Sequence, residues 1–155
     1  MNETERTIDS FGGSYNFLSN FYPSIVTLDE DKTLFGESFN YPTVEHAFQA
    51  AKALDKTNRL FVLGSRSPGE AKKRGGKVNP LRDGWDQYRL QVMEELLKKK
   101  FQDKVLAQKL LDTGNAKLVE GNTWGDRYWG VCRGQGQNHL GILLMKIRDE
   151  IRLLN

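Results

Sequence analysis

The feature that most constrains this chain is a stripe of apolar side chains between positions 85 and 101. The members recur at steps of three and four residues, and they are Trp85, Tyr88, Val92, Met93, Leu96, Leu97 and Phe101. This spacing places them on one face of an α-helix, which predicts a helix from about Trp85 to Phe101. Because such a face is stable only when other elements cover it, the stripe indicates a folded domain with a helical core.

Other segments extend this reading along the chain. Helical periodicity and capping residues predict helices over 43–53, 58–63, 67–75 and 104–111, and from Asn138 to the end. Short β-prone runs predict strands at Ile25–Leu28 and Glu37–Tyr41, joined by a polar turn over Asp29–Lys32, and a further strand over Lys117–Glu120. The expected fold is a mainly helical α+β domain with a small antiparallel β element.

Length and composition favour one domain over residues 1–155. The chain has 155 residues, of which 38% are hydrophobic, and no repeat or linker divides it. It has no run of about 20 apolar residues, and its first ten residues are polar, so we expect a cytoplasmic protein without a membrane segment or secretory signal. Cys132 is the single cysteine, and His46 and His139 lie far apart, so we expect neither a disulfide framework nor a metal site.

The positive charges are more informative by position than by number. With 23 Lys and Arg against 20 Asp and Glu, the net charge is only +3, which is weak support for nucleic-acid binding. The run Lys98–Lys100 is interpreted as a solvated helix face. A second cluster, Lys72, Lys73, Arg74, Lys77 and Arg82, is interrupted by glycines. It is either another solvated surface or a phosphate site, and in the second case Lys77 and Arg82 contact the substrate.

The helix expected over 43–53 carries a polar stripe. Glu45 and Lys52 are seven residues apart, so both fall on one face at 3.6 residues per turn, with Gln49 between them. Apolar neighbours suggest that this face is covered, and covered polar groups need partners. Glu45 is a candidate catalytic carboxylate. Lys52 is either a nucleophilic amine with a lowered pKa or a charged partner of Glu45 or of a phosphate. The plainer alternative is a helix-start carboxylate and a surface lysine.

Aromatic and carboxylate residues mark three further candidates. In a glycine-rich loop over 122–138, Asp126 can act as an acid or acceptor and Trp129 as a pocket wall, although the loop is equally explained by an aromatic plug. Trp85 is either a stacking surface or a core residue. The turn Leu18–Pro23 offers Asn20 and Phe21 as substrate contacts, or serves only the turn.

Taken together, these residues suit a flat, anionic substrate. Aromatic rings stack on a base, cations hold phosphate, and carboxylates stabilise the oxocarbenium-like sugar of glycosidic cleavage. A phosphorylated nucleoside or a similar ribosylated heterocycle fits this description. The residues alone do not specify the substrate further.

Eight segments in this order carry a specific resemblance. They are Leu18–Pro23, Thr43–Lys52, Ala71–Lys73, Arg82–Asp86, Lys100–Phe101, Leu111–Gly114, Asp126–Gly130 and Asn138–Met145. In these segments the sequence resembles the NADAR family, also called YbiA-like, and the resemblance extends from Phe11 to about Leu153. It departs from the family pattern at Gly76, where arginine is common, and at Cys132, where glycine is common.

The resemblance implies an α+β fold and a cofactor-free N-glycosidase. Family members cleave phosphorylated intermediates of early riboflavin biosynthesis, whereas others remove ADP-ribose from guanine. By motif, the family's functional residues correspond to Glu45, Lys52, Trp85, Asp126 and Trp129. The implied partner is a small ribosylated or ADP-ribosylated heterocycle, with nucleic acid only as a modified substrate. A module that binds ADP-ribose-like ligands without turnover is the alternative from another class.

Overall fold

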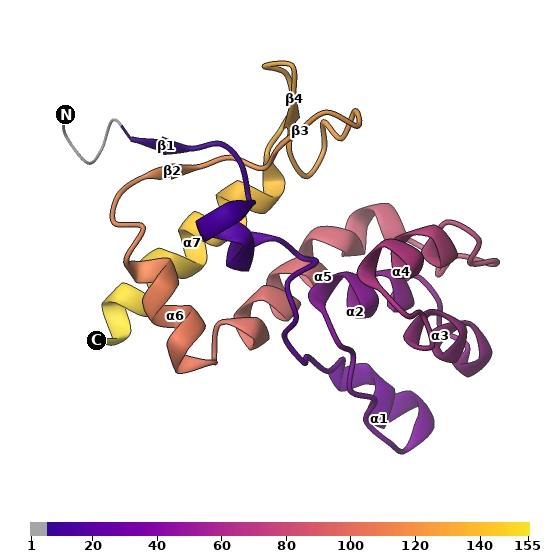
Figure 1. Ribbon diagram of the computed structural model, residues 1–155. Coiled ribbons are helices and arrows are strands. Elements are labelled where there is room, and N and C mark those ends of the chain that lie inside the picture. Colours follow the sequence, from indigo (N-terminus) through magenta and orange to yellow (C-terminus); the bar gives the residue numbers. More distant parts are fainter. Residues whose placement is uncertain (1–5) are drawn as a thin grey trace. The chain divides into compact units, whose positions relative to one another are not determined.

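A computed structural model describes residues 6–155, which form two compact units (Figure 1). One unit comprises residues 20–100, and the other comprises residues 6–19 together with 101–155. Positions 1–5, part of the polar N-terminal segment noted in the sequence, lie outside the described residues. Among the helices described, none is both long and apolar enough to cross a membrane.

The unit of residues 20–100 is built around one short, fully buried helix. Its helices are α1 (Asp29–Phe35), α2 (Val44–Ala50), α3 (Lys56–Leu63), α4 (Pro68–Gly75) and α5 (Trp85–Lys100). All seven residues of α2 are buried, and α2 contacts α3, α4 and α5. The predicted caps are confirmed: the Thr43 side chain accepts from the N–H of His46, and the Ser67 side chain accepts from that of Glu70. These caps fix where the two polar-faced helices begin.

Helix α5 confirms the predicted apolar stripe with two differences. Tyr88 is exposed, and its ring lies 5.1 Å from the guanidinium carbon of Arg82. The reading of Lys98–Lys100 as a solvated face is wrong for Lys100, which is only 1% exposed and lies 5.7 Å from the centre of the Tyr22 ring. Burial lowers the pKa of Lys100 to about 7. The helix turns this last lysine inward, whereas Lys98 pairs with Glu94 at 3.0 Å.

The predicted antiparallel hairpin is wrong in this unit. Residues 29–35, of which 29–32 were expected to form the turn, are helix α1, and only an isolated antiparallel bridge joins Val26 and Tyr41. Three acidic residues in the first turn favour the helix because they face the positive end of its dipole. Gly36, at φ 76°, ends it in the left-handed conformation that glycine adopts without strain.

The second unit combines two helices with two short parallel ladders. Its elements are β1 (Thr7–Ile8), a 3-10 helix (Gly13–Leu18), α6 (Lys104–Leu111), β2 (Lys117–Leu118), β3 (Gly121–Asn122), β4 (Val131–Cys132) and α7 (His139–Leu154). β1 pairs with β2 and β3 with β4, both in parallel, and α7 packs on α6 and β2. The mainly helical α+β class is therefore confirmed, while the strand direction is corrected from antiparallel to parallel.

Candidate active site

Glu45 is a buried carboxylate in the first turn of α2. It is 8% exposed, and its backbone N–H donates to the carbonyl of Asn20 at 3.1 Å. The Nε2 of Gln49, one turn later and also buried, donates to Oε1 of Glu45 at 2.8 Å. Glu45 and Gln49, two of the three members of the predicted polar stripe, therefore contact each other on α2, and Gln49 orients the carboxylate of Glu45. A carboxylate held in this way is prepared to stabilise positive charge.

The close packing of α4 on α2 holds Gln49 in place. A Cβ on Gly75 would lie 1.9 Å from Oε1 of Gln49, so only glycine permits this approach. The sequence alone explains Gly75 as the end of a predicted helix. The structure shows a second reason for glycine at this position, which is its close contact with Gln49. The same Oε1 is buried without a hydrogen-bond partner, which leaves Gln49 fixed by packing and by Glu45.

Lys52 follows α2 in a tight turn, whereas the sequence predicted that the helix would continue to position 53. Its N–H donates to the carbonyl of Gln49 at 3.3 Å, an i→i−3 bond. The helix stops because side chains and loops take the next carbonyls. The carbonyl of Lys52 accepts from the N–H of Arg82 at 2.7 Å, and that of Ala53 accepts from Nε of Arg59 at 2.9 Å.

The environment of Lys52 lowers the pKa of its amine. Burial is the largest cause and lowers the pKa of Lys52 below its usual value, and the neighbouring charge of Lys72 lowers it further. The carboxylate of Glu45 acts in the opposite direction and raises the pKa, but the net shift is downward. Glu45 and Lys72 thus both act electrostatically on Lys52, in opposite directions.

Arg82 is engaged by the protein rather than open to a ligand. Its Nη1 donates to Oε1 of Glu30 at 2.7 Å and to the carbonyl of Ala51 at 3.1 Å. Glu30 also pairs with the fully buried Arg59. This network, which sequence reasoning missed, ties α1 and α3 to the end of α2 that carries Lys52. The only signal for it in the sequence was the row of acids that was taken as a turn.

Trp85, Asn20 and Phe21 lie in the same unit but in different environments. Trp85 is buried, with its ring centre 5.2 Å from that of Phe48. The Nδ2 of Asn20 donates to the sulfur of Met93 at 3.6 Å, and its Oδ1 is buried without a partner. Phe21 is exposed. Of the three, Asn20 is the one whose backbone directly holds Glu45.

Asp126 and Trp129 belong to the other compact unit. Oδ1 of Asp126 accepts from the backbone N–H of Tyr128 at 3.1 Å and of Trp129 at 2.9 Å. The ring of Tyr128 lies 4.8 Å from that of Trp129 and 4.5 Å from that of His139. Asp126 therefore shapes the loop that presents the aromatic side chains. Cys132, a departure from the family pattern, is buried in β4.

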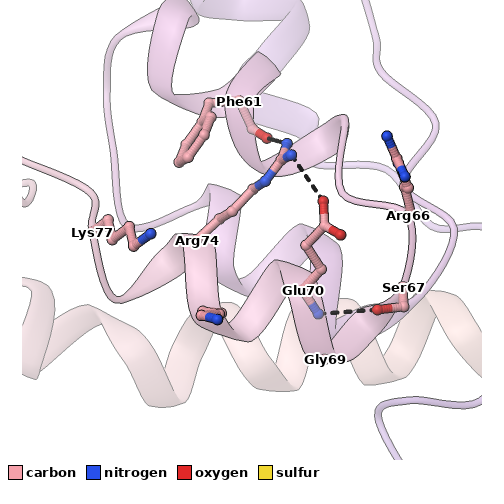
Figure 2. Close-up of a pocket in the computed structure, with 8 residues that line it drawn as sticks. Phe61, Arg66, Ser67, Gly69, Glu70, Arg74 and Lys77 are labelled. Atoms are coloured by element: carbon pink, nitrogen blue, oxygen red, sulfur yellow. Dashed lines mark hydrogen bonds and ion pairs between the residues drawn. The ribbon is translucent and has the colours of Figure 1, made fainter.

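Lys77 lines a cavity between α3 and α4 (Figure 2). None of the other predicted site residues is among those that line it. Within residues 6–155, no group of three His, Cys, Asp or Glu side chains is placed to hold a metal ion. The structure thus brings together Glu45 on α2 and Lys52 in the turn after it, and places Lys77 on a separate cavity.

Comparison with known proteins identifies the family. The family model of the NADAR domain matches residues 8–152. This chain belongs to the NADAR family. The match spans both compact units, which supports the resemblance found in the sequence motifs.

Curated NADAR proteins are similar over almost the whole chain. N-glycosidase YbiA of Escherichia coli K12 is 37% identical over 99% of this chain and 92% of its own length. The chloroplastic riboflavin biosynthesis protein PYRR of Zea mays is 34% identical over 94% of this chain and 24% of its own length. The NMR structure of E. coli YbiA matches 99% of this chain and 88% of that one with a TM-score of 0.80 at 36% identity. The chain is therefore similar to these proteins in sequence, and to E. coli YbiA also in fold.

Proposed function

We propose that this NADAR domain is an N-glycosidase that hydrolyses phosphorylated ribosylaminopyrimidine intermediates of early riboflavin biosynthesis. The observation that carries the proposal is an interacting pair: Glu45, a buried carboxylate on α2, and Lys52, a lysine in the turn after α2 whose pKa is lowered. The names of the relatives support both the bond type and the pathway, since they include N-glycosidases and riboflavin biosynthesis proteins. Because one family model spans both compact units, we also treat residues 1–155 as one functional domain.

Lys52 supplies the nucleophile in this mechanism. Its neutral Nζ attacks C1 of the ribose, the bond from C1 to the base nitrogen breaks, and the base leaves with the electron pair and takes up the proton that Nζ loses. The ring then opens as the bond from C1 to the ring oxygen breaks, and that oxygen takes up a proton. The sugar remains attached as a Schiff base until water adds to C1 and releases the sugar and the free amine. The lowered pKa of Lys52 supports this role because only the neutral amine attacks.

Glu45 manages the charge and the protons of these steps. Its carboxylate stabilises the oxocarbenium-like sugar as the base departs, then accepts a proton from the attacking water. The bond from Gln49 keeps one carboxylate oxygen oriented, which preserves its position through the cycle. Arg82 acts as a positioning residue, because it holds the backbone on which Lys52 lies.

Asp126 and Trp129 are assigned supporting roles on their own unit. Asp126 holds the backbone N–H groups of Tyr128 and Trp129, so we assign it to positioning the loop. Trp129 is half-buried and keeps its candidacy as a stacking surface for the base. Asn20, next to Glu45, is the candidate polar contact to the substrate within residues 20–100, because its buried Oδ1 has no partner.

One experiment tests the activity and its specificity. The purified chain is incubated with a ribosylaminopyrimidine phosphate and, separately, with ADP-ribosylated guanosine, and the products are identified by mass spectrometry. We expect ribose 5-phosphate from the first substrate. Release of ADP-ribose from the second alone would replace the proposed substrate with ADP-ribosyl-guanine. Tight binding of either compound without a product would overturn the catalytic proposal in favour of a binding module.

A further inference from the structure

The cavity between α3 and α4 has no part in the mechanism proposed above. Its volume is about 680 Å³, within the range of small-molecule sites, and its lining comes from α3, α4 and the segments beside them. Four cationic side chains line it, Arg66, Lys73, Arg74 and Lys77, against one carboxylate, Glu70. The lining therefore carries a strong excess of positive charge.

The protein itself satisfies only one of the four cations. Arg74 donates from Nη1 to the carbonyl of Phe61 at 2.7 Å, and its Nη2 pairs with Glu70 at 2.8 Å. Figure 2 shows both interactions at the centre of the cavity lining. Because this ion pair cancels the single carboxylate, Glu70 is not available to the other cations. Arg74 thus forms a fixed wall, with its guanidinium carbon 4.7 Å from the centre of the Phe61 ring.

Arg66, Lys73 and Lys77 are exposed, and their side chains make no hydrogen bond or ion pair with any described residue. Lysines elsewhere in the same unit do find partners: Lys98 pairs with Glu94 at 3.0 Å and Lys99 with Asp29 at 2.6 Å. Three uncompensated charges around one cavity repel each other and attract an anion into it. Lysine side chains on α5 therefore have acidic partners, whereas those of Lys73 and Lys77 have none among the described residues.

The arrangement of these cations favours an elongated anion. Arg66 precedes α4 and Lys77 follows it, and a helix of eight residues is about 12 Å long. In Figure 2 the two side chains lie on opposite sides of Arg74. One phosphate group carries too little charge to balance three cations, whereas a chain of linked phosphates offers an anionic group to each of them. The hydroxyl of Ser67, whose oxygen already accepts from Glu70, keeps its proton for a phosphate oxygen.

The cavity is separate from the polar stripe of α2. Helix α4 presents Gly75 to Gln49 on one side, and Lys72 is the cation that acts on Lys52. Lys73, the next residue, lines the cavity instead, while Lys72 does not. Of the two neighbouring lysines on α4, Lys72 thus acts on Lys52 and Lys73 lines the cavity.

We propose that the cavity between α3 and α4 is a second ligand site, which binds an anion of two or more linked phosphates through Arg66, Lys73 and Lys77. It does not require turnover, so it goes beyond the N-glycosidase activity. The linked phosphates can be an inorganic chain or the polyphosphate of a nucleotide. In the second case the exposed part of the Phe61 ring is the available stacking surface for the base.

Isothermal titration calorimetry on the full chain tests the site with inorganic tripolyphosphate and with orthophosphate. We expect tripolyphosphate to bind at least about tenfold more tightly than orthophosphate at low salt, and to weaken steeply as salt screens the charges. The double variant Arg66→Ala/Lys73→Ala should lose about tenfold or more in affinity, because two charge-assisted contacts are removed. Lys32→Ala, at an exposed lysine of α1 in the same unit, is the matched control and should bind as the wild type does.

A second titration, with ATP, distinguishes the two sources of linked phosphates. Tighter binding of ATP than of tripolyphosphate, reduced by Phe61→Leu, identifies the nucleotide, whereas equal affinities identify the inorganic chain. The site is disproved if tripolyphosphate binds no better than orthophosphate, or if the double variant and Lys32→Ala bind alike. Since none of these measurements involves turnover, failure here leaves the N-glycosidase proposal standing, and loss of turnover does not affect this one.

Discussion

Two regions of the unit of residues 20–100 place their cationic side chains in opposite environments, one partly buried and one exposed. In the turn after α2, Lys52 is half-buried, interacts electrostatically with Glu45 and Lys72, and has a lowered pKa. Around the cavity between α3 and α4, Arg66, Lys73 and Lys77 are exposed and unpaired. Burial therefore lowers the pKa of the amine in the first case, whereas the side chains of the second group lie in solvent. The difference teaches that the proposed chemistry and the proposed anion binding require different environments for a cation, and that residues 20–100 provide both.

The largest expected effect comes from the carboxylate of α2. Glu45→Gln should lower kcat by about 10²–10⁴-fold, because an amide neither stabilises positive charge nor accepts the proton of water. The fold should persist, since an amide oxygen can still accept from Gln49. Steady-state kinetics measure the change, and thermal melting checks the fold.

Glu37→Gln provides the matched control, because this exposed glutamate in the same unit pairs only with a surface lysine, Lys56. It should retain the wild-type rate. A folded Glu45→Gln variant with near-normal kcat would show that Glu45 takes no part in the mechanism and that Glu45 and Lys52 do not act as a catalytic pair.

Lys52 is the next test, because it distinguishes a covalent amine from a charge. Borohydride added during turnover should trap the sugar on the wild-type chain as a mass increase on the peptide that contains Lys52. Lys52→Arg keeps the charge and should give neither adduct nor turnover. Lys56→Arg, four residues later on the surface, is the control and should behave as the wild type. Turnover without an adduct in the wild type, or an active Lys52→Arg, would assign Lys52 a purely electrostatic role.

Two adjacent lysines of α4 offer a sharper comparison. Removing the charge of Lys72 in Lys72→Met should raise the pKa of Lys52, since Lys72 lowers it. Because the neutral amine reacts, the rising limb of the pH–rate profile should move to higher pH and the rate at neutral pH should fall. Lys73→Met should instead weaken tripolyphosphate binding by several-fold, whereas Lys72→Met should not change it by more than about twofold.

The pH–rate profile and calorimetry of both variants measure these effects. If Lys72→Met and Lys73→Met change the same property, the two faces of α4 are one site and the separation is wrong. Lys32→Met, at the exposed lysine of α1, controls for general loss of positive charge and should leave both properties unchanged.

Local rules predicted much of the fold but not its longer contacts. The Ser67 cap and the apolar stripe of α5 follow from spacing alone, and both are confirmed. The prediction of a hairpin over 25–41 was wrong because it followed from β-propensity alone. The acidic residues of the first turn and Gly36 at the end favour helix α1 instead. The end of α2 also failed, since Arg59 and Arg82 take its next carbonyls from distant positions. These hydrogen bonds depend on the tertiary structure, which a pattern of neighbouring residues does not reveal.

The candidate site shows the same division. Glu45 and Lys52 share a helical period, so spacing could propose them as partners. Gln49 was seen on the stripe, but its bond to Glu45 depends on the close approach of Gly75, which sequence alone explained as a helix end. Lys100 was missed because a run of three lysines gives no sign that one of them is buried.

The smallest expected effect concerns Trp85, which distinguishes core packing from ligand stacking. Its ring is buried against Phe48, so Trp85→Phe should cost about 2 kcal/mol of stability and lower Tm by roughly 4–8 °C, while KM changes less than about twofold. Trp124→Phe, at an exposed tryptophan, controls for loss of the indole and should leave Tm unchanged within about 1 °C. An unchanged Tm with a tenfold higher KM in Trp85→Phe would instead make Trp85 a ligand contact, since base stacking is worth about 1–3 kcal/mol. In that case the buried face of α2 would bind the base as well as perform the chemistry.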